Sequence, residues 1–193
     1  MATVITKDAY FATGVEVLSD LGYGGLKLAE VCKRLGVTTG SFYHYFSSWS
    51  SYTRDLASDY FIGLTIERVG ALRAEPDPRK RIDSIFEIGL KLPHGAESAI
   101  RAWSSVDPQV RAVQSEIDRQ RVDVLWESAL EILHDQRLAR LFAHWSLYLL
   151  IGYEQSTLPP DTDGLAWMVA QQLDALDSGR FSSLPESASW LYG

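Results

Sequence analysis

Short hydroxyl side chains and a glycine follow one another in residues 36–46, which read Gly-Val-Thr-Thr-Gly-Ser-Phe-Tyr-His-Tyr-Phe. Thr38, Thr39 and Ser41 can hydrogen-bond to phosphates or to the edges of nucleic-acid bases, and a threonine methyl can contact thymine. Gly40 has no side chain, so the backbone beside it can approach a base edge closely. These residue types in this order favour sequence readout by the leading end of a short helix.

Several of these residues also have a purely structural interpretation. Thr38 is a suitable N-cap, and its hydroxyl and the exposed N–H groups behind it could bind a phosphate. It would cap the helix equally well without DNA, and Gly40 could serve only to let two helices pack closely. Lys33 is a further candidate for a phosphate contact, whereas Phe42 and Phe46 are expected in the core.

The elements that would position these residues are short helices. Apolar residues at helical spacing predict helices over 6–21 and 26–35, with a break at Gly22, and Thr38 predicts a third helix over 39–45. Gly36 follows the second helix at a position where positive φ costs little. Two short helices joined by a tight turn with a glycine form a helix-turn-helix, whose second helix normally enters the DNA major groove.

Charge is distributed unevenly along the chain. The 193 residues carry a net charge of −7, which argues against a protein that coats nucleic acid non-specifically. Residues 1–47 contain four basic and four acidic side chains, so the excess of acid lies in 48–193. One cysteine, Cys32, excludes a disulfide or a multi-thiolate metal site within a single chain, and it is expected to be a small core residue.

The remainder of the chain also has helical periodicity and no strand-like alternation, so we predict an all-α fold. A helix-turn-helix domain of residues 1–47 would precede a larger helical domain of residues 48–193. Pro76 and Pro78 interrupt the pattern, and Asp77 and Asp107 can each cap a new helix. The helices expected in the larger domain span 49–73, 79–91, 96–104, 108–133, 136–154 and 162–177.

The N-terminal residues resemble those of the TetR family of bacterial transcriptional regulators. The resemblance rests on Gly-Tyr at 22–23, Gly-Val-Thr at 36–38, Gly40 and Phe-Tyr-His-Tyr-Phe at 42–46, and it covers about residues 6–47. It implies a homodimer that binds a double-stranded DNA operator, represses transcription, and is released by a small molecule. It also implies that Tyr43 and His44 contact phosphates.

The chain departs from the family pattern at three places. Lys27 stands where the family usually opens the second helix with Ser or Thr, Trp49 stands where a phosphate-binding lysine is common, and the basic N-terminal extension is reduced to Lys7. These departures imply a weaker electrostatic contribution to DNA binding, offset in part by Lys27, Lys33 and Arg34.

The resemblance further implies that the larger domain binds an unidentified small-molecule effector and forms the dimer through residues 136–154 and 162–177. An aromatic-rich helical domain can enclose an apolar cavity. The residues expected to line it, each of which could instead be plain core, are Phe86, Leu90, Trp103, Trp126, Trp145 and Tyr148.

No metal site, cofactor, signal peptide or membrane span is expected from the sequence, and a cytoplasmic location is predicted. Two other functions remain open. The chain could be an interaction protein that keeps this fold without binding DNA, which its low basic charge would allow. It could also be a small helical enzyme, but it contains no nucleophile elbow, glycine-rich phosphate loop or metal-ligand cluster.

Overall fold

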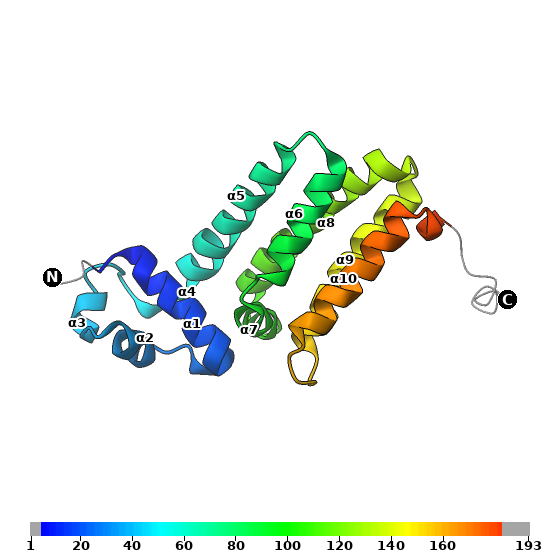
Figure 1. The fold of residues 1–193 in the computed structure, drawn as a ribbon. Helices are drawn as coiled ribbons and strands as arrows, with labels where there is room; N and C mark the ends of the chain where they lie inside the picture. Colours follow the sequence, from blue (N-terminus) through cyan, green and yellow to red (C-terminus); the bar gives the residue numbers. More distant parts are fainter. Residues whose placement is uncertain (1–4, 183–193) are drawn as a thin grey trace. The chain divides into compact units, whose positions relative to one another are not determined.

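The computed structural model describes residues 5–182, and within this range all regular secondary structure is helical, as predicted. The α-helices are labelled in Figure 1. The α-helices are α1 (Lys7–Gly25), α2 (Leu28–Leu35), α3 (Thr39–Phe42), α4 (Trp49–Asp55), α5 (Ile62–Arg73), α6 (Pro78–Leu90), α7 (His94–Ser104), α8 (Pro108–Leu133), α9 (Gln136–Gln155) and α10 (Thr162–Asp177). A π-helical segment, Leu56–Phe61, lies between α4 and α5, and a 3₁₀ turn, Arg180–Ser182, follows α10.

The helix ends lie where the capping residues predict them. Gly36 has φ +67° at the end of α2, and its N–H donates to the carbonyl of Lys33. The Thr38 hydroxyl accepts the Ser41 N–H at 3.2 Å and so caps α3. The Asp77 carboxylate accepts the N–H of Arg79 at 2.9 Å at the start of α6. These side chains and this glycine satisfy backbone groups that a helix terminus leaves without partners.

Three predicted helices differ from the observed ones. The expected end near residue 21 coincides with a kink at Gly22 (φ 66°), after which a further helical turn continues to Gly25. The third helix ends at Phe42, and hydrogen-bonded turns carry the chain on through Tyr45. The single helix expected over 49–73 contains a π-helical segment, which side-chain periodicity does not reveal.

The residues pack into two units. Within the described residues, the first unit contains 5–74 and 92–121, and the second contains 75–91 and 122–182, so α8 contributes to both. Residues 1–4 and 183–193 lie outside the described range. The functional boundary predicted at residue 47 stays a prediction.

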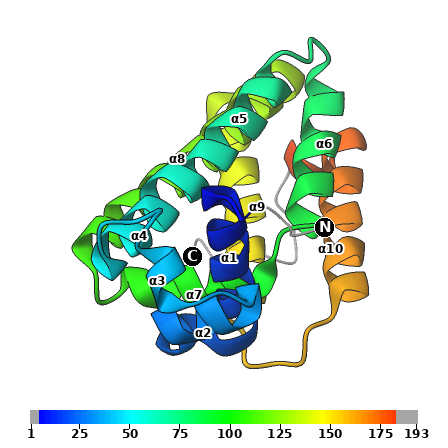
Figure 2. The same ribbon diagram turned by 90° about the vertical axis from the view of Figure 1, so that its left-hand side faces the viewer.

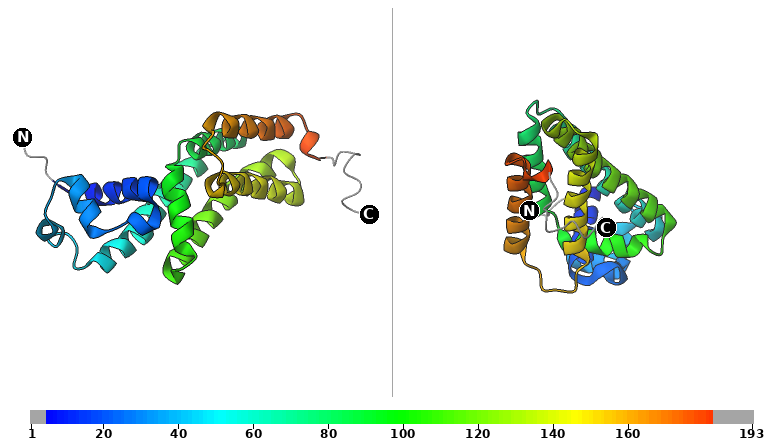
Figure 3. Two further views of the ribbon diagram at one scale, coloured as in Figure 1. Left: turned by 90° about the horizontal axis from the view of Figure 1, so that it is seen from below. Right: turned by 90° about the vertical axis from the view of Figure 1, so that its right-hand side faces the viewer.

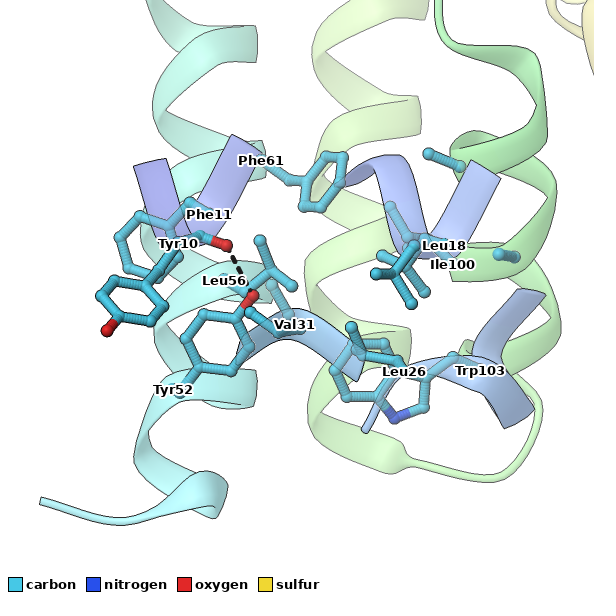
Figure 4. Close-up of a cluster of buried hydrophobic side chains, with 14 of the residues drawn as sticks. Tyr10, Phe11, Leu18, Leu26, Val31, Tyr52, Leu56, Phe61, Ile100 and Trp103 are labelled. Atoms are coloured by element: carbon cyan, nitrogen blue, oxygen red, sulfur yellow. Dashed lines mark hydrogen bonds between the residues drawn. The ribbon is translucent and has the colours of Figure 1, made fainter. Parts of the chain in front are cut away.

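The first unit has one hydrophobic core, to which α1 to α4, the π-helical segment, α7 and α8 contribute buried residues. In Figure 2, α1, α2 and α3 lie together in the lower part of the view. Side chains from α4, the π-helical segment and α7 join the same core, among them Tyr52, Leu56 and Ile100, which are almost completely buried. Figure 4 shows part of this cluster and the hydrogen bond from the Tyr52 hydroxyl to the carbonyl of Tyr10. The helix-turn-helix therefore rests on α4 and α7.

The second unit is organised around α10, which packs against α6 and α9 (Figure 3). Its core includes Ile82, Phe86 and Phe142. An Arg79–Asp177 ion pair joins the start of α6 to the end of α10, and a buried Gln172 amide on α10 donates to Ser146 on α9 at 2.7 Å. Hydrophobic and polar contacts thus both hold α10 in place.

Candidate DNA-reading surface

An aromatic cluster fixes the position of α3 from behind. Phe42 and Phe46 are almost completely buried, which confirms their expected place in the core. The ring of Tyr10 on α1 meets each of them edge-on, with ring centroids 5.6 Å apart in both pairs. Edge-to-face contacts of this kind add to the free energy gained by burial. A helix of four residues is too short to be stable alone, so these contacts must hold it.

The opposite side of α3 is accessible. Thr38, Thr39 and Gly40 are exposed, and a Cβ added at Gly40 would meet only the Thr38 hydroxyl, at 3.6 Å. Tyr43, the C-cap residue of α3, is 55% exposed, and His44 lies in the following turn and is exposed too. Five of the residues predicted to contact DNA are therefore brought together on one accessible surface.

Ser41 is placed differently from its neighbours. Its hydroxyl accepts a hydrogen bond from the buried Tyr10 hydroxyl at 3.4 Å, and its backbone N–H donates to Thr38. This oxygen is therefore engaged on the inner side of α3. A DNA contact by Ser41 stays a prediction that would have to compete with this bond.

The basic residues near α2 are not equally available. Lys27 is exposed at the N-cap of α2 and its side chain makes no capping hydrogen bond. Lys33 is exposed and lies 3.7 Å from Glu30. Arg34 donates to Asp20 at 2.6 Å and to Glu30 at 3.0 Å, and these bonds raise the pKa of Arg34. Because Asp20 and Glu30 neutralise its charge within the protein, Arg34 contributes less to DNA binding than expected. It therefore compensates only weakly for the basic residues that the family pattern has and this chain lacks.

The sequence predicted no role for two tyrosines that support the surface. The Tyr45 hydroxyl donates to the carbonyl of Ile5 at 2.6 Å, and the buried Tyr52 hydroxyl donates to that of Tyr10 at 2.8 Å. Desolvation raises the pKa of Tyr52 strongly, because burial disfavours the phenolate. Aromatic residues at 42, 46, 49 and 52, spaced by three or four, were the available signal for this cluster.

The residues predicted to line an effector cavity divide between the two units. Trp103 belongs to the first unit, where its ring stacks on Tyr23 with centroids 4.9 Å apart. Phe86, Leu90 and Trp126 pack into the core of the second unit. In the same unit, the ring of Trp145 stacks on Phe181, and Tyr148 is 64% exposed. Whether these residues bind an effector stays a prediction.

Residues 5–182 contain neither a candidate membrane span nor a candidate metal cluster. No helix in this range is long and apolar enough to cross a membrane. No group of three or more His, Cys, Asp or Glu residues in the described chain could hold a metal ion. The single thiol, that of Cys32, is buried, as predicted, and burial raises its pKa.

Comparison with known proteins gives consistent matches. Residues 11–48 match the family model described as bacterial regulatory proteins, tetR family. A curated relative, the HTH-type transcriptional regulator BetI of Rhizobium meliloti (strain 1021), is 21% identical over 99 residues. That alignment covers 51% of this chain and 49% of the relative, so it spans about half the length of each.

Solved structures share the fold over most of the chain. A TetR transcriptional regulator from Legionella pneumophila superposes with a TM-score of 0.74 at 14% identity, covering 90% of this chain and 98% of the other. AibR, in complex with isovaleryl coenzyme A and operator DNA, superposes with a TM-score of 0.62 at 17% identity, covering 86% and 96%. At such identities the similarity establishes the fold.

Proposed function

We propose that this chain, whose residues 11–48 match the model of bacterial regulatory proteins of the tetR family, is a transcriptional regulator of that family and binds a double-stranded DNA operator through α2 and α3. The observation that carries the proposal is the accessible side of α3, where Thr39, Gly40 and Tyr43 are exposed while Phe42 is buried behind them. Short side chains suit contact with base edges, and a tyrosine hydroxyl suits a phosphate. The AibR complex with operator DNA supports the proposal.

Binding of DNA is tested by gel retardation of a palindromic fragment taken from near the gene of this protein. We expect retardation by the parent chain and none by Gly40→Trp, because a large side chain would hold α3 away from the base edges. Tyr43→Ala should weaken binding by at least tenfold, since a hydrogen bond to a charged group contributes roughly 1.5–3 kcal/mol.

Gly70→Trp is the matched control, because Gly70 is exposed on α5 and an added Cβ there meets nothing within 4 Å. It should bind DNA as the parent does. Unchanged affinity in both Gly40→Trp and Tyr43→Ala would refute the assignment of α3 as the reading helix.

We propose further that the chain acts as a homodimer. Exposed apolar side chains on α9 occur at 141, 145 and 148, a spacing that places them on one side of the helix, and α10 exposes Trp167 and Met168. Phe142, Leu165 and Val169 are already buried within the chain, so they are not available to a partner. A two-fold axis would present two reading helices to two half-sites of DNA.

Light scattering after size exclusion tests this proposal. The parent should elute with twice the mass of the chain, and Leu141→Glu combined with Tyr148→Glu should give the single-chain mass. Ile66→Glu on α5, also an exposed apolar position, is the control and should remain dimeric. A parent that stays monomeric at micromolar concentration would contradict the proposal.

Finally, we propose that a small molecule bound by the larger helical domain releases a repressor from the operator. Phe86, Leu90 and Trp126 are the candidate lining residues in the second unit, and the exposed Trp145 and Tyr148 are assigned to the dimer face instead. The coenzyme A ester in the AibR complex supports effector binding in this fold. Tryptophan fluorescence against a panel of metabolites tests it. Saturable quenching must coincide with loss of DNA retardation.

A further inference from the structure

A hollow of about 460 Å³ opens beside the helix-turn-helix, within the first unit. Its size is in the range of small-molecule sites. Three aromatic residues, two hydroxyl residues and one carboxylate are among the eight that line it, and none of the eight is basic. They are Tyr23, Gly24, Leu26, Trp49, Ser50, Thr53, Trp103 and Asp107.

The aromatic rings are held in position by their neighbours. Trp103 stacks on Tyr23 with an interplanar angle of 14°, and Trp49 stacks on Tyr52 with centroids 4.9 Å apart. Figure 4 shows Trp103 beside Leu26 at the base of the cluster. Rings fixed in this way can receive a ligand without the entropy loss of ordering flexible side chains.

The buried donor of Trp103 lacks an acceptor. Trp103 is 4% exposed, and its indole N–H has no hydrogen-bond partner within the part of the chain that the structure describes. Leaving such a donor unpaired is costly, so an acceptor oxygen that a ligand brought within reach of it would gain a hydrogen bond.

Among the residues that line the hollow, Asp107 carries the charge, which is negative. Asp107 uses one oxygen to accept the N–H groups of Gln109 and Val110 at the start of α8. The nearby Arg111 is not a lining residue, and its guanidinium donates to the carbonyls of Ser104 and Ser105. A carboxylate among aromatic rings attracts a cation, both by charge and by the negative faces of the rings.

We propose that this hollow binds a small organic cation that carries an oxygen acceptor. The positive group lies among Tyr23, Trp49 and the Asp107 carboxylate, and the oxygen accepts from the Trp103 indole. The site is distinct from the effector residues proposed in the second unit, and its test requires no DNA. Its failure would leave the proposed DNA binding untouched.

Calorimetric titration of the full chain with acetylcholine chloride tests the proposal. The uncharged isostere 3,3-dimethylbutyl acetate, in which carbon replaces the nitrogen, has nearly the same shape and the same ester. We expect saturable binding of the cation and at least tenfold weaker binding of the isostere. Equal binding of the two esters, or no saturable binding of the cation, would overturn the proposal.

Three substitutions in the hollow test which of its residues contact the cation. Asp107→Asn keeps a good helix cap but removes the charge, and it should weaken cation binding about three- to tenfold. Trp49→Leu should weaken it about two- to fivefold, as expected for a cation–π contact of roughly 0.5–1 kcal/mol. Trp103→Phe keeps a ring but removes the N–H, and it should weaken binding about threefold.

Asp135→Asn is the control for Asp107→Asn, because it also removes the charge of an aspartate that caps a helix. That helix is α9, in the second unit. It should leave cation binding unchanged. Circular dichroism establishes that each variant is folded. Cation binding that is equally strong in Asp107→Asn and in Trp49→Leu would place the cation elsewhere and refute the assignment.

Discussion

At the scale of single residues, two glycines four positions apart have different roles. Gly36 has φ +67°, a conformation that costs an L-residue with a side chain roughly 1–2 kcal/mol. Gly40 lies within α3 at ordinary helical φ, with open space around it. Gly36 is therefore required by the backbone, whereas Gly40 is required only if something must approach α3 closely.

The change Gly36→Ala should lower the free energy of unfolding by about 1 kcal/mol, because alanine disfavours positive φ. The change Gly40→Ala should raise it by about 0.5 kcal/mol, because alanine favours the helix. Chemical denaturation of the two variants checks the pair. If both changes destabilise equally, the backbone difference between the two positions does not control stability.

At the scale of elements, close backbone packing joins α1 to α7. A Cβ added at Gly95, near the start of α7, would lie 2.6 Å from the Ser19 carbonyl oxygen on α1. Backbone cannot move aside as a flexible side chain can, so the two helices would have to separate. The first unit therefore depends on the glycine at the start of α7.

We expect Gly95→Val to destabilise the protein by about 1–3 kcal/mol, the usual effect of overpacking. Gly63→Ala on α5 is the control, since an added Cβ there meets nothing within 4 Å, and it should be neutral or slightly stabilising. Thermal unfolding followed by circular dichroism compares the two. A Gly95→Val variant as stable as the parent would show that α1 and α7 can separate without penalty.

Whether a structural feature could be predicted from the sequence depends on whether its cause is local or lies in packing between helices. Caps and proline starts act locally, so Gly36, Thr38, Asp77 and Asp107 placed the helix boundaries correctly. The π-helical segment and the early end of α3 depend on packing against other helices. The exposed candidate DNA-contact residues followed from a local motif. The contacts of Arg34 with Asp20 and of Ser41 with Tyr10 join these residues to α1, and they could not be predicted from sequence spacing.

At the scale of the whole molecule, contacts distant in sequence make stability depend on pH. Arg79 donates to both carboxylate oxygens of Asp177, at 2.7 and 2.9 Å, across 98 positions of the chain. These hydrogen bonds lower the pKa of Asp177. A carboxylate with a lowered pKa stabilises the folded state above its unfolded pKa of about 3.9, and the contribution is lost as pH falls through the folded value.

Asp177→Asn should therefore reduce stability at pH 7 by no more than about 1 kcal/mol, since the pair is partly exposed and screened by solvent. The difference from the parent should shrink as the pH falls below about 4. Urea midpoints measured from pH 7 to pH 3 test this, with the exposed Glu67→Gln as control. A difference that stays constant over this range would contradict the assignment.

The first unit is discontinuous in sequence, since residues 75–91 separate its two parts. During synthesis, α1 to α5 emerge before α7 exists, so apolar side chains such as Leu18 and Tyr52 must wait for Ile100 and Trp103. Contacts between distant residues form slowly, and exposed apolar surface promotes aggregation in the meantime. The helix-turn-helix therefore cannot complete its core until α7 has been synthesised. Slow translation beyond residue 74 would lengthen the time during which its apolar side chains are exposed.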